Sequence, residues 1–224
     1  MAGDGIMAVA LANRCFLYRY LWRAFSSVAD EVFLATAADD RTCKECELML
    51  GDDSSGMKSQ AEIAAIARTA PDCAQRLRGE YTKLFVGPGK LPAPPWESVY
   101  VCGEDLLFQQ STLAVRQAFR AAGYRASGYP HEADDHLAIE LHFMATLAED
   151  AKRACEKHDD ERLRLALSRQ LVFLSEHLNA WLPAFVQRLR EQAPSSLGAF
   201  YPEFAALAAE VCKADSSALG ELMA

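Results

Sequence analysis

Two stretches of the chain concentrate side chains that could bind a cationic ligand. The first, residues 131–136, reads HEADDH and places three carboxylates and two imidazoles just before an apolar helical pattern. Glu140 follows four residues after His136, on the same face of a helix. The carboxylates could pair with guanidinium groups, and His136 could donate a hydrogen bond or respond to pH. The alternative is ordinary helix capping, which explains Asp134 or Asp135 but not the whole cluster.

The second stretch, residues 81–100, contains the least helical part of the chain. Four prolines and two glycines fall within residues 87–96, which excludes a regular helix there. Prolines restrict the unfolded chain, so a connection of this length can be rigid. Trp96 and Tyr100 offer large amphipathic rings that lose little entropy on binding. The alternative is a proline-braced loop whose aromatic rings only cover the core.

A third, weaker stretch places His177 and Trp181 four residues apart. On a helix the two side chains would meet on one face, and a position in the core is the favoured interpretation.

Familiar catalytic and metal-binding motifs are missing. A phosphate-binding loop fails because Leu84 stands where a glycine is needed and no hydroxyl residue follows Gly89-Lys90. A zinc-protease motif beginning at His131 fails because Asp135 replaces its second histidine. No histidine has a glutamate three residues before it, as a di-iron bundle requires. Composition leaves a Cys/His nucleophile pair open, but no local signature supports one. We therefore predict no catalytic residue, metal or cofactor.

The seven cysteines are odd in number and scattered, which favours free thiols in a reducing compartment over a disulfide framework. Cys43 and Cys46 form a single Cys-x-x-Cys. It lacks the second ligand pair of a structural zinc site and the βαβ context of a redox motif. We interpret this pair as incidental helix cysteines, and the sequence leaves any further role open.

Length and charge limit the protein class. The 224 residues, 51% of them hydrophobic, suffice for one substantial core or two small ones. No run of eighteen apolar residues occurs, so we expect no transmembrane helix. In the N-terminal stretch Asp4 stands where a signal peptide has its basic region, and Arg14 and Arg19 interrupt the apolar run. We therefore expect a helix of the mature protein and not a signal peptide. The net charge of −8 disfavours nucleic acid and suits a basic partner, although acidity also serves solubility.

Apolar spacing predicts helices along nearly the whole chain. In the first of them one apolar face is marked at spacings of four, three, four and three by Leu11, Cys15, Tyr18, Trp22 and Phe25. We expect helices at about 6–25, 30–50, 58–70, 72–85, 111–122, 134–148, 160–179, 181–192 and 199–213, with 97–101 briefly extended. The fold class expected is all-α: a single domain over 1–224 with a proline-rich central loop and a hinge within 123–135.

The central segments resemble a known family. The runs LFVGP at 84–88 and LPAPPWESVY at 91–100, followed by LLF at 106–108 and STLAVRQ at 111–117, resemble the TorD/DmsD family of redox-enzyme maturation chaperones, and its DmsD members in particular. The strong matches cover roughly residues 81–140, whereas the first 80 residues match only in helical character.

Two short family motifs also occur. The Glu-x-x-Asp-His pattern falls on Glu132, Asp135 and His136, and the His-Leu-x-x-Trp pattern begins at His177. Ala133 stands where the family usually has proline, which would loosen the hinge without removing the carboxylates.

The resemblance implies a non-catalytic, cytoplasmic chaperone. Such proteins bind the twin-arginine (Tat) signal peptide of a molybdopterin oxidoreductase, here of the DMSO-reductase type, and hold the apo catalytic subunit until its cofactor is loaded and export can follow. The peptide-binding residues carried over from the family are Trp96, Ser98, Tyr100, Glu132, Asp135 and His136.

Other interpretations remain open from the sequence. The Tat translocase is a further candidate partner, whereas nucleic acid and stable membrane insertion are not expected. One alternative is a weak guanine-nucleotide-binding or hydrolysing protein, because such binding has been associated with the family. Another is a structural subunit of a reductase complex. The identity of the client and the choice between a monomer and a domain-swapped dimer also stay open.

Overall fold

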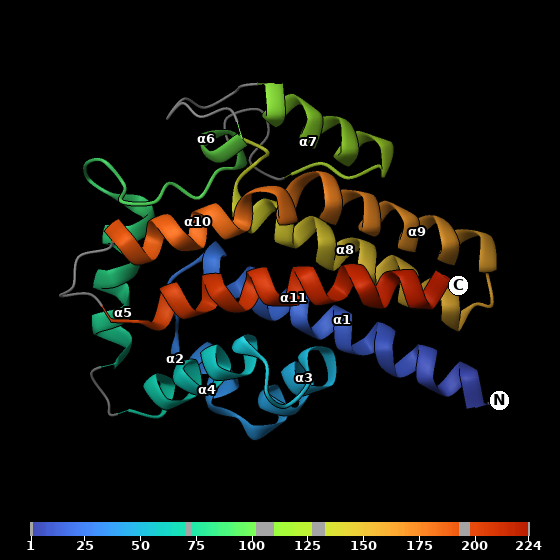
Figure 1. Ribbon diagram of the computed structural model, residues 1–224, viewed down its shortest axis with the longest axis horizontal. Coiled ribbons are helices and arrows are strands. Elements are labelled where there is room, and N and C mark those ends of the chain that lie inside the picture. The colour runs from blue at the N-terminus through green and yellow to red at the C-terminus, as the bar shows by residue number, and fades with distance from the viewer. Residues whose placement is uncertain (1, 70–72, 102–109, 127–132, 193–197, 224) are drawn as a thin grey trace.

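Helices account for almost all of the described chain, as the apolar spacing predicted (Figure 1). The computed structural model describes residues 2–69, 73–101, 110–126, 133–192 and 198–223. The elements in these ranges are α1 (Ala2–Ser26), α2 (Glu31–Ala38), α3 (Asp40–Leu50), α4 (Ser55–Arg68), α5 (Cys73–Tyr81), the π-helical η1 (Thr82–Val86), α6 (Glu97–Val101), α7 (Gln110–Ala121), α8 (Leu137–Glu156), α9 (Asp160–Phe173), the π-helical η2 (Leu174–Leu178), α10 (Asn179–Gln192) and α11 (Phe200–Met223).

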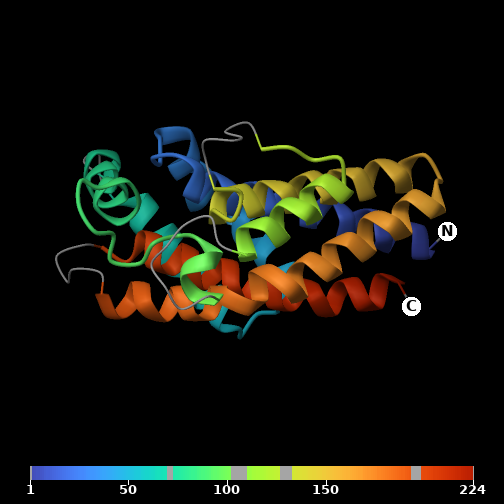
Figure 2. The same ribbon diagram turned by 90° about the horizontal axis from the view of Figure 1, so that it is seen from above.

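The long helices run lengthwise through the molecule and enclose its core. α1 packs along α8, α8 along α9, and α10 along α11. Helices α2–α4 lie on one side of this layer, whereas α6 and α7 lie on the other (Figures 1 and 2). On the predicted face of α1, Leu11, Cys15, Tyr18 and Phe25 are buried in this core, and Trp22 is partly buried and packs against it.

Two carboxylates that cap helix N-termini account for differences from the predicted helix boundaries. The helix expected over 30–50 is two helices because the side chain of Asp39 accepts a hydrogen bond from the Arg41 N–H at 2.8 Å and starts α3. Residues 97–101, expected to be extended, form α6, whose N-terminus is capped by the distant Asp135. The prediction of an extended segment was wrong because this cap comes from a part of the chain 37 residues away.

The boundaries of α8 and α11 also differ from the expectation. α8 begins at Leu137 and is capped by His136, not by an aspartate. α11 continues past Lys213 to Met223, and Leu219 lies buried in this extension.

α9, η2 and α10 form one helical run, where the sequence predicted a break near residue 180. Within η2 the N–H of Asn179 bonds to the carbonyl of Leu174, the wider spacing of a π-helix. Pro183 follows inside α10 and offers no N–H to the Asn179 carbonyl. The π-helical turn carries His177 into the interior, where its side chain is 5% exposed.

A buried polar cluster fixes α1 against α9 and α11. The guanidinium of Arg14 donates to both carboxylate oxygens of Asp215, at 2.6 and 3.0 Å, and to Gln170 Oε1 at 2.6 Å. Tyr18 donates to Asp215 Oδ2 at 2.6 Å. All four side chains are buried. Across the described ranges, no helix is both long and apolar enough to span a membrane.

Candidate functional site

The proline-rich segment and the start of α8 are joined along their backbones. Trp96 and His136 form an antiparallel bridge. On either side of it the Glu97 N–H donates to the Asp135 carbonyl at 3.0 Å, and the Leu137 N–H donates to the Pro95 carbonyl at 2.9 Å. Residues 95–97 and 135–137 are therefore held edge to edge, although they lie about forty positions apart in the chain.

Asp135 occupies a fully buried position between the two segments. Its Oδ2 accepts a hydrogen bond from the Ser98 N–H at 2.9 Å, which caps the N-terminus of α6. Its side chain is 0% exposed, and Oδ1 has no hydrogen-bond partner among the described residues. The hydroxyl of Ser98 is likewise buried without a partner there. A buried carboxylate oxygen without a hydrogen-bond donor is energetically costly.

Trp96 and His136 stand next to Asp135 with their rings in contact. The ring centroids are 5.1 Å apart and the planes meet at 77°, and both side chains are partly exposed. His136 Nδ1 accepts a hydrogen bond from the Ala138 N–H at 3.1 Å, which caps α8. Burial lowers the pKa of His136 to about 4, against the opposing effect of Asp135. His136 is therefore neutral at pH 7 and does not repel a cation at this site.

Two further carboxylates lie behind Asp135. Glu97 is 2% exposed and contacts His177 Nδ1 at 3.0 and 3.2 Å. Glu140 is fully buried, and its Oε2 accepts a hydrogen bond from Trp181 Nε1 at 3.1 Å. Burial raises the pKa of Glu140 well above its ordinary value, and the charges of Glu97 and Asp135 raise it further. Glu140 therefore keeps its proton to a higher pH than an exposed glutamate does.

The raised pKa of Glu140 predicts a measurable pH dependence of the protein's stability. The folded protein keeps a proton that the unfolded chain releases above about pH 4.5, so Glu140 costs stability increasingly as the pH rises toward the raised pKa. Glu140→Gln cannot titrate and can still accept the Trp181 hydrogen bond. We expect the variant's advantage in melting temperature over wild type to grow by about 3 °C or more between pH 5 and pH 7.5.

Thermal unfolding followed by circular dichroism across this pH range measures the effect. Glu176→Gln, on the exposed side of η2, is the control and should leave the profile unchanged. A pH-independent difference between Glu140→Gln and wild type would contradict the raised pKa of Glu140.

Tyr100 has a packing environment different from that of Trp96. Its ring stacks on Trp181 at 5.5 Å with the planes 24° apart, and the Arg188 guanidinium lies 5.8 Å from the ring centre. Arg188 also donates to the Pro92 carbonyl at 3.1 Å. Tyr100 therefore joins α6 to α10 and to the proline-rich segment, while part of its ring stays exposed.

The structure brings together all the proposed site residues that it describes. Ser98 and Asp135 share a hydrogen bond, Trp96 and His136 share the bridge, and Tyr100 lies one turn further along α6. Glu132 lies outside the described residues. The carboxylates of Asp134 and Asp135 are buried, and Asp134 is already paired with Arg116 at 2.5 Å.

The sequence interpretation missed the role of Glu97, placed Glu140 on the helical face of His136, and favoured a core position for His177 and Trp181. His177 and Trp181 do lie in the interior, but they contact the two inner carboxylates, Glu97 and Glu140. The only sequence signals for these contacts were two pairs of residues spaced four positions apart: His177 and Trp181, and His136 and Glu140. Glu97 gave none, because its partner is 80 residues away.

The Cys-x-x-Cys pair has the character of ordinary helix cysteines. Cys46 is buried, and burial raises the pKa of its thiol to about 12, so the thiol stays protonated at neutral pH. Both Cys43 and Cys46 are free thiols. Among the described residues, no group of three or more His, Cys, Asp or Glu side chains is arranged to hold a metal ion.

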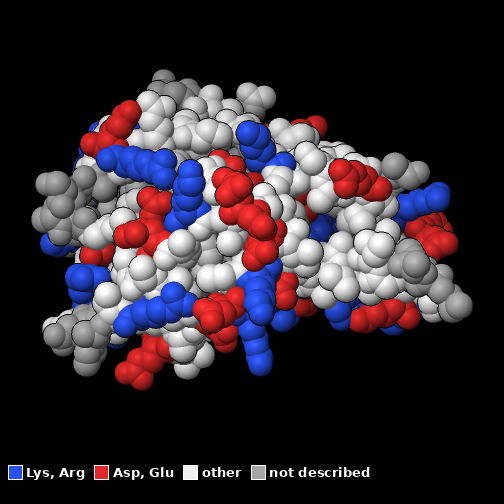
Figure 3. All heavy atoms as spheres, turned by 60° about the horizontal axis from the view of Figure 1, so that its bottom comes forward, with Lys and Arg blue, Asp and Glu red and all other residues white. Residues whose placement is uncertain are grey.

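The net negative charge is not concentrated on the face that carries α2–α4. On that face basic and acidic side chains are interspersed (Figure 3). This face therefore carries no large area of a single charge sign.

Comparison with known proteins identifies relatives of the chain. A family model described as nitrate reductase delta subunit matches residues 51–187. The Tat proofreading chaperone DmsD of Salmonella typhi is 30% identical over 176 residues, which cover 76% of this chain and 78% of that protein. Chaperone protein TorD of Vibrio cholerae is 29% identical over 199 residues, covering 89% and 83%. Both relatives are named as chaperones. The chain belongs to the TorD/DmsD family of Tat redox-enzyme maturation chaperones.

Proposed function

We propose that this chain binds, in the cytoplasm, the twin-arginine leader of a molybdopterin oxidoreductase of the DMSO-reductase type. It would hold the apo catalytic subunit until cofactor loading, after which export through the Tat translocase can proceed. Trp96, Ser98, Tyr100, Glu132, Asp135 and His136 are the proposed contact residues.

The observation that carries this proposal is the state of Asp135. Its carboxylate is fully buried, and one oxygen lacks a hydrogen-bond partner among the described residues. A guanidinium presents a planar fork of donors that matches a carboxylate, so an arginine side chain can satisfy this oxygen and neutralise the charge.

The neighbours of Asp135 suit an arginine followed by apolar residues. His136 is neutral at pH 7, because burial lowers its pKa to about 4. The partly exposed Trp96 ring offers an apolar and cation-attracting face beside the carboxylate. The net charge of −8 favours encounter with a basic peptide, an effect that salt weakens.

Calorimetry with a synthetic leader peptide tests the proposal. We expect binding in the nanomolar-to-micromolar range that weakens as salt rises, and little binding when both arginines are replaced by alanine. A peptide with two lysines in their place separates guanidinium recognition from simple charge and should bind more weakly than the arginine peptide. Equal affinity for the arginine and alanine peptides would rule out the proposed function.

The class of reductase that this chain serves can be tested by comparing leader peptides directly. Relatives of this chain carry the names DmsD and TorD, and the matching family model is described as nitrate reductase delta subunit. Leaders of the corresponding reductases can be compared in the same calorimetric experiment. Stable copurification with a mature, exported reductase would instead favour a structural subunit.

We also propose that the chain is one chaperone domain with a hinge within 123–135. Gly123 begins this segment with a φ of +72°, a backbone conformation that glycine adopts readily. Such a hinge permits either a monomer or a domain-swapped dimer, which light scattering after size-exclusion chromatography distinguishes.

A further inference from the structure

Three buried oxygen atoms near the proposed leader site have no hydrogen-bond partner among the described residues. Two of them, Asp135 Oδ1 and Ser98 Oγ, belong to residues already proposed to contact the leader. The third is Thr112 Oγ1 on α7, in a residue that is 1% exposed and that the sequence did not mark as part of a site. Because buried hydroxyls nearly always have a partner, an unpartnered one marks a position where a polar group of a ligand can bind.

The packing of α7 on α8 places Thr112 level with the leader site. The two helices run side by side in the same direction (Figures 1 and 2). The ring centroids of Phe119 on α7 and Phe143 on α8 are 4.6 Å apart. Seven residues back, or roughly 10.5 Å of helix, the chain reaches Thr112 from Phe119 and His136 from Phe143. Thr112 therefore lies level with His136, the residue that follows Asp135.

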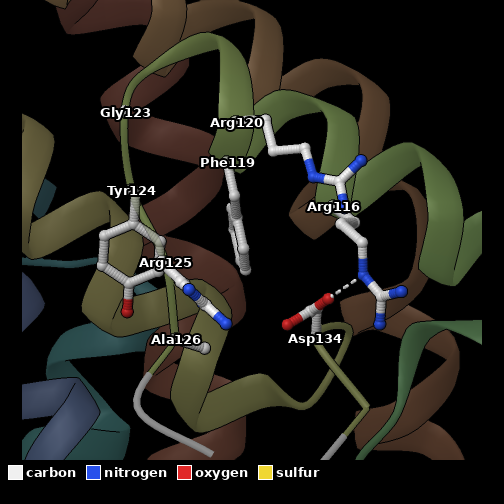
Figure 4. Close-up of a pocket in the computed structure, with 8 residues that line it drawn as sticks. All are labelled: Arg116, Phe119, Arg120, Gly123, Tyr124, Arg125, Ala126 and Asp134. Atoms are coloured by element: carbon white, nitrogen blue, oxygen red, sulfur yellow. Dashed lines mark hydrogen bonds and ion pairs between the residues drawn. The ribbon is translucent and has the colours of Figure 1, made fainter. Parts of the chain in front are cut away.

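Two further contacts turn the Thr112 face of α7 toward the site. Thr112 and Arg116 are four residues apart and therefore share one face of α7. The Arg116 side chain extends from this face to Asp134, the residue before Asp135 (Figure 4). α6, which carries Ser98, also packs against α7. Thus α6, α7 and the segment before α8 each bring one unpartnered oxygen to the same junction.

We propose that Thr112 is a specificity-determining residue that accepts a hydrogen bond from the leader arginine bound at Asp135. The inference rests on the proposed function, because the leader supplies the guanidinium. The three oxygens of Ser98, Thr112 and Asp135 form no hydrogen bond with one another. A guanidinium carries its N–H donors on three separate nitrogens, whereas a lysine ammonium carries its donors on one. Acceptors that stand apart are reached better by the guanidinium, so the three oxygens together favour arginine over lysine.

An isosteric substitution tests the role of Thr112. Thr112→Val replaces an unpartnered buried hydroxyl with a methyl group, so a role in packing alone predicts an unchanged or higher melting temperature and unchanged peptide affinity. A hydrogen bond to the leader predicts instead that affinity for the twin-arginine peptide falls about fivefold. Affinity for the peptide with two lysines should change by less than about twofold, because its ammonium depends less on this acceptor. Calorimetry measures both affinities.

Two variants control for shape and for the substitution itself. Thr112→Ser keeps the hydroxyl and should bind the twin-arginine peptide almost as tightly as wild type. Thr146→Val makes the same change on α8, where the hydroxyl donates to the His142 carbonyl at 2.9 Å. Thr146 lies roughly 15 Å of helix beyond His136, so this variant should leave the affinity unchanged. Unchanged twin-arginine affinity in Thr112→Val, or an equal loss for both peptides, would overturn the assignment.

A measurement on the unmodified chain applies even where Thr112→Val does not fold. The methyl signal of Thr112 in NMR spectra should shift when the twin-arginine peptide is added, because a guanidinium then enters the surroundings of a buried side chain. The methyl signal of Thr146 serves as the internal control and should stay in place. A Thr112 signal that does not move in the peptide complex would overturn the contact.

Failure of the proposed function gives a different result. In that case wild type does not bind the twin-arginine peptide, and ethylguanidinium replaces the peptide as the probe. It should shift the Thr112 methyl signal more than ethylammonium does at equal concentration. No shift, or equal shifts with the two cations, would overturn the role of Thr112 in selecting a guanidinium.

Discussion

Asp215→Asn is expected to lower the melting temperature by about 10 °C. Asp215 accepts hydrogen bonds from Arg14 and Tyr18, and all three side chains are buried. Removing the charge leaves the Arg14 guanidinium buried without a counter-ion, and breaking such a pair costs roughly 3–5 kcal/mol. For a chain of this size, each kcal/mol corresponds to roughly 2–4 °C. Thermal unfolding followed by circular dichroism measures the change.

A compensating variant separates the missing charge from a loss of packing. Arg14→Met combined with Asp215→Leu and Tyr18→Phe removes both charges and the hydroxyl of the cluster, so no buried charge is left without a partner. Gln170 remains, and its amide still donates to the Leu147 and Ala166 carbonyls. Replacing a buried ion pair with apolar residues of similar volume is often neutral or stabilising, so much of the lost stability should return.

A surface pair serves as the control for Asp215. Asp150 pairs with Arg153 at 2.7 Å, and their side chains are 49% and 61% exposed. Asp150→Asn should change the melting temperature by less than about 2 °C. If Asp215→Asn behaved like this control, the buried pair would have little effect on stability.

The sequence predicted the helices well where the local spacing of apolar residues determines which side of a helix is buried. The face of α1 follows from Leu11, Cys15, Tyr18 and Phe25, because their spacing returns to one side of a helix. Apolar spacing failed where the start of a helix depends on a residue far away in the chain. The helix of residues 97–101 exists with a cap from Asp135, and apolar spacing carries no information about a cap 37 residues away.

The candidate site was predictable in composition but not in arrangement. The HEADDH run and the Trp96 segment marked the two halves, and the family resemblance joined them. Their chemistry depends on burial that the sequence does not display: Asp135 is fully buried, and burial lowers the pKa of the His136 imidazole. The contact between Glu97 and His177 spans 80 positions and arises only in the folded core.

Asp135→Asn is expected to weaken binding of the twin-arginine peptide about 30-fold. The substitution keeps the shape of the side chain and an oxygen that can accept the Ser98 N–H, so the cap of α6 survives. It removes the negative charge that would pair with a guanidinium in a buried setting. Losing one partner of such a pair costs roughly 2–5 kcal/mol, and about 2 kcal/mol corresponds to a 30-fold change in Kd.

The melting temperature separates a binding role for Asp135 from a structural one. Because the Ser98 hydrogen bond remains, Asp135→Asn should shift the melting temperature by no more than about 3 °C. Asp134→Asn is the matched control. It breaks the pair with Arg116, so it should lower stability. It should leave the affinity for a peptide without acidic residues unchanged. If Asp135→Asn lowered affinity only in proportion to a collapse in melting temperature, Asp135 would be a cap of α6 and the leader would bind elsewhere.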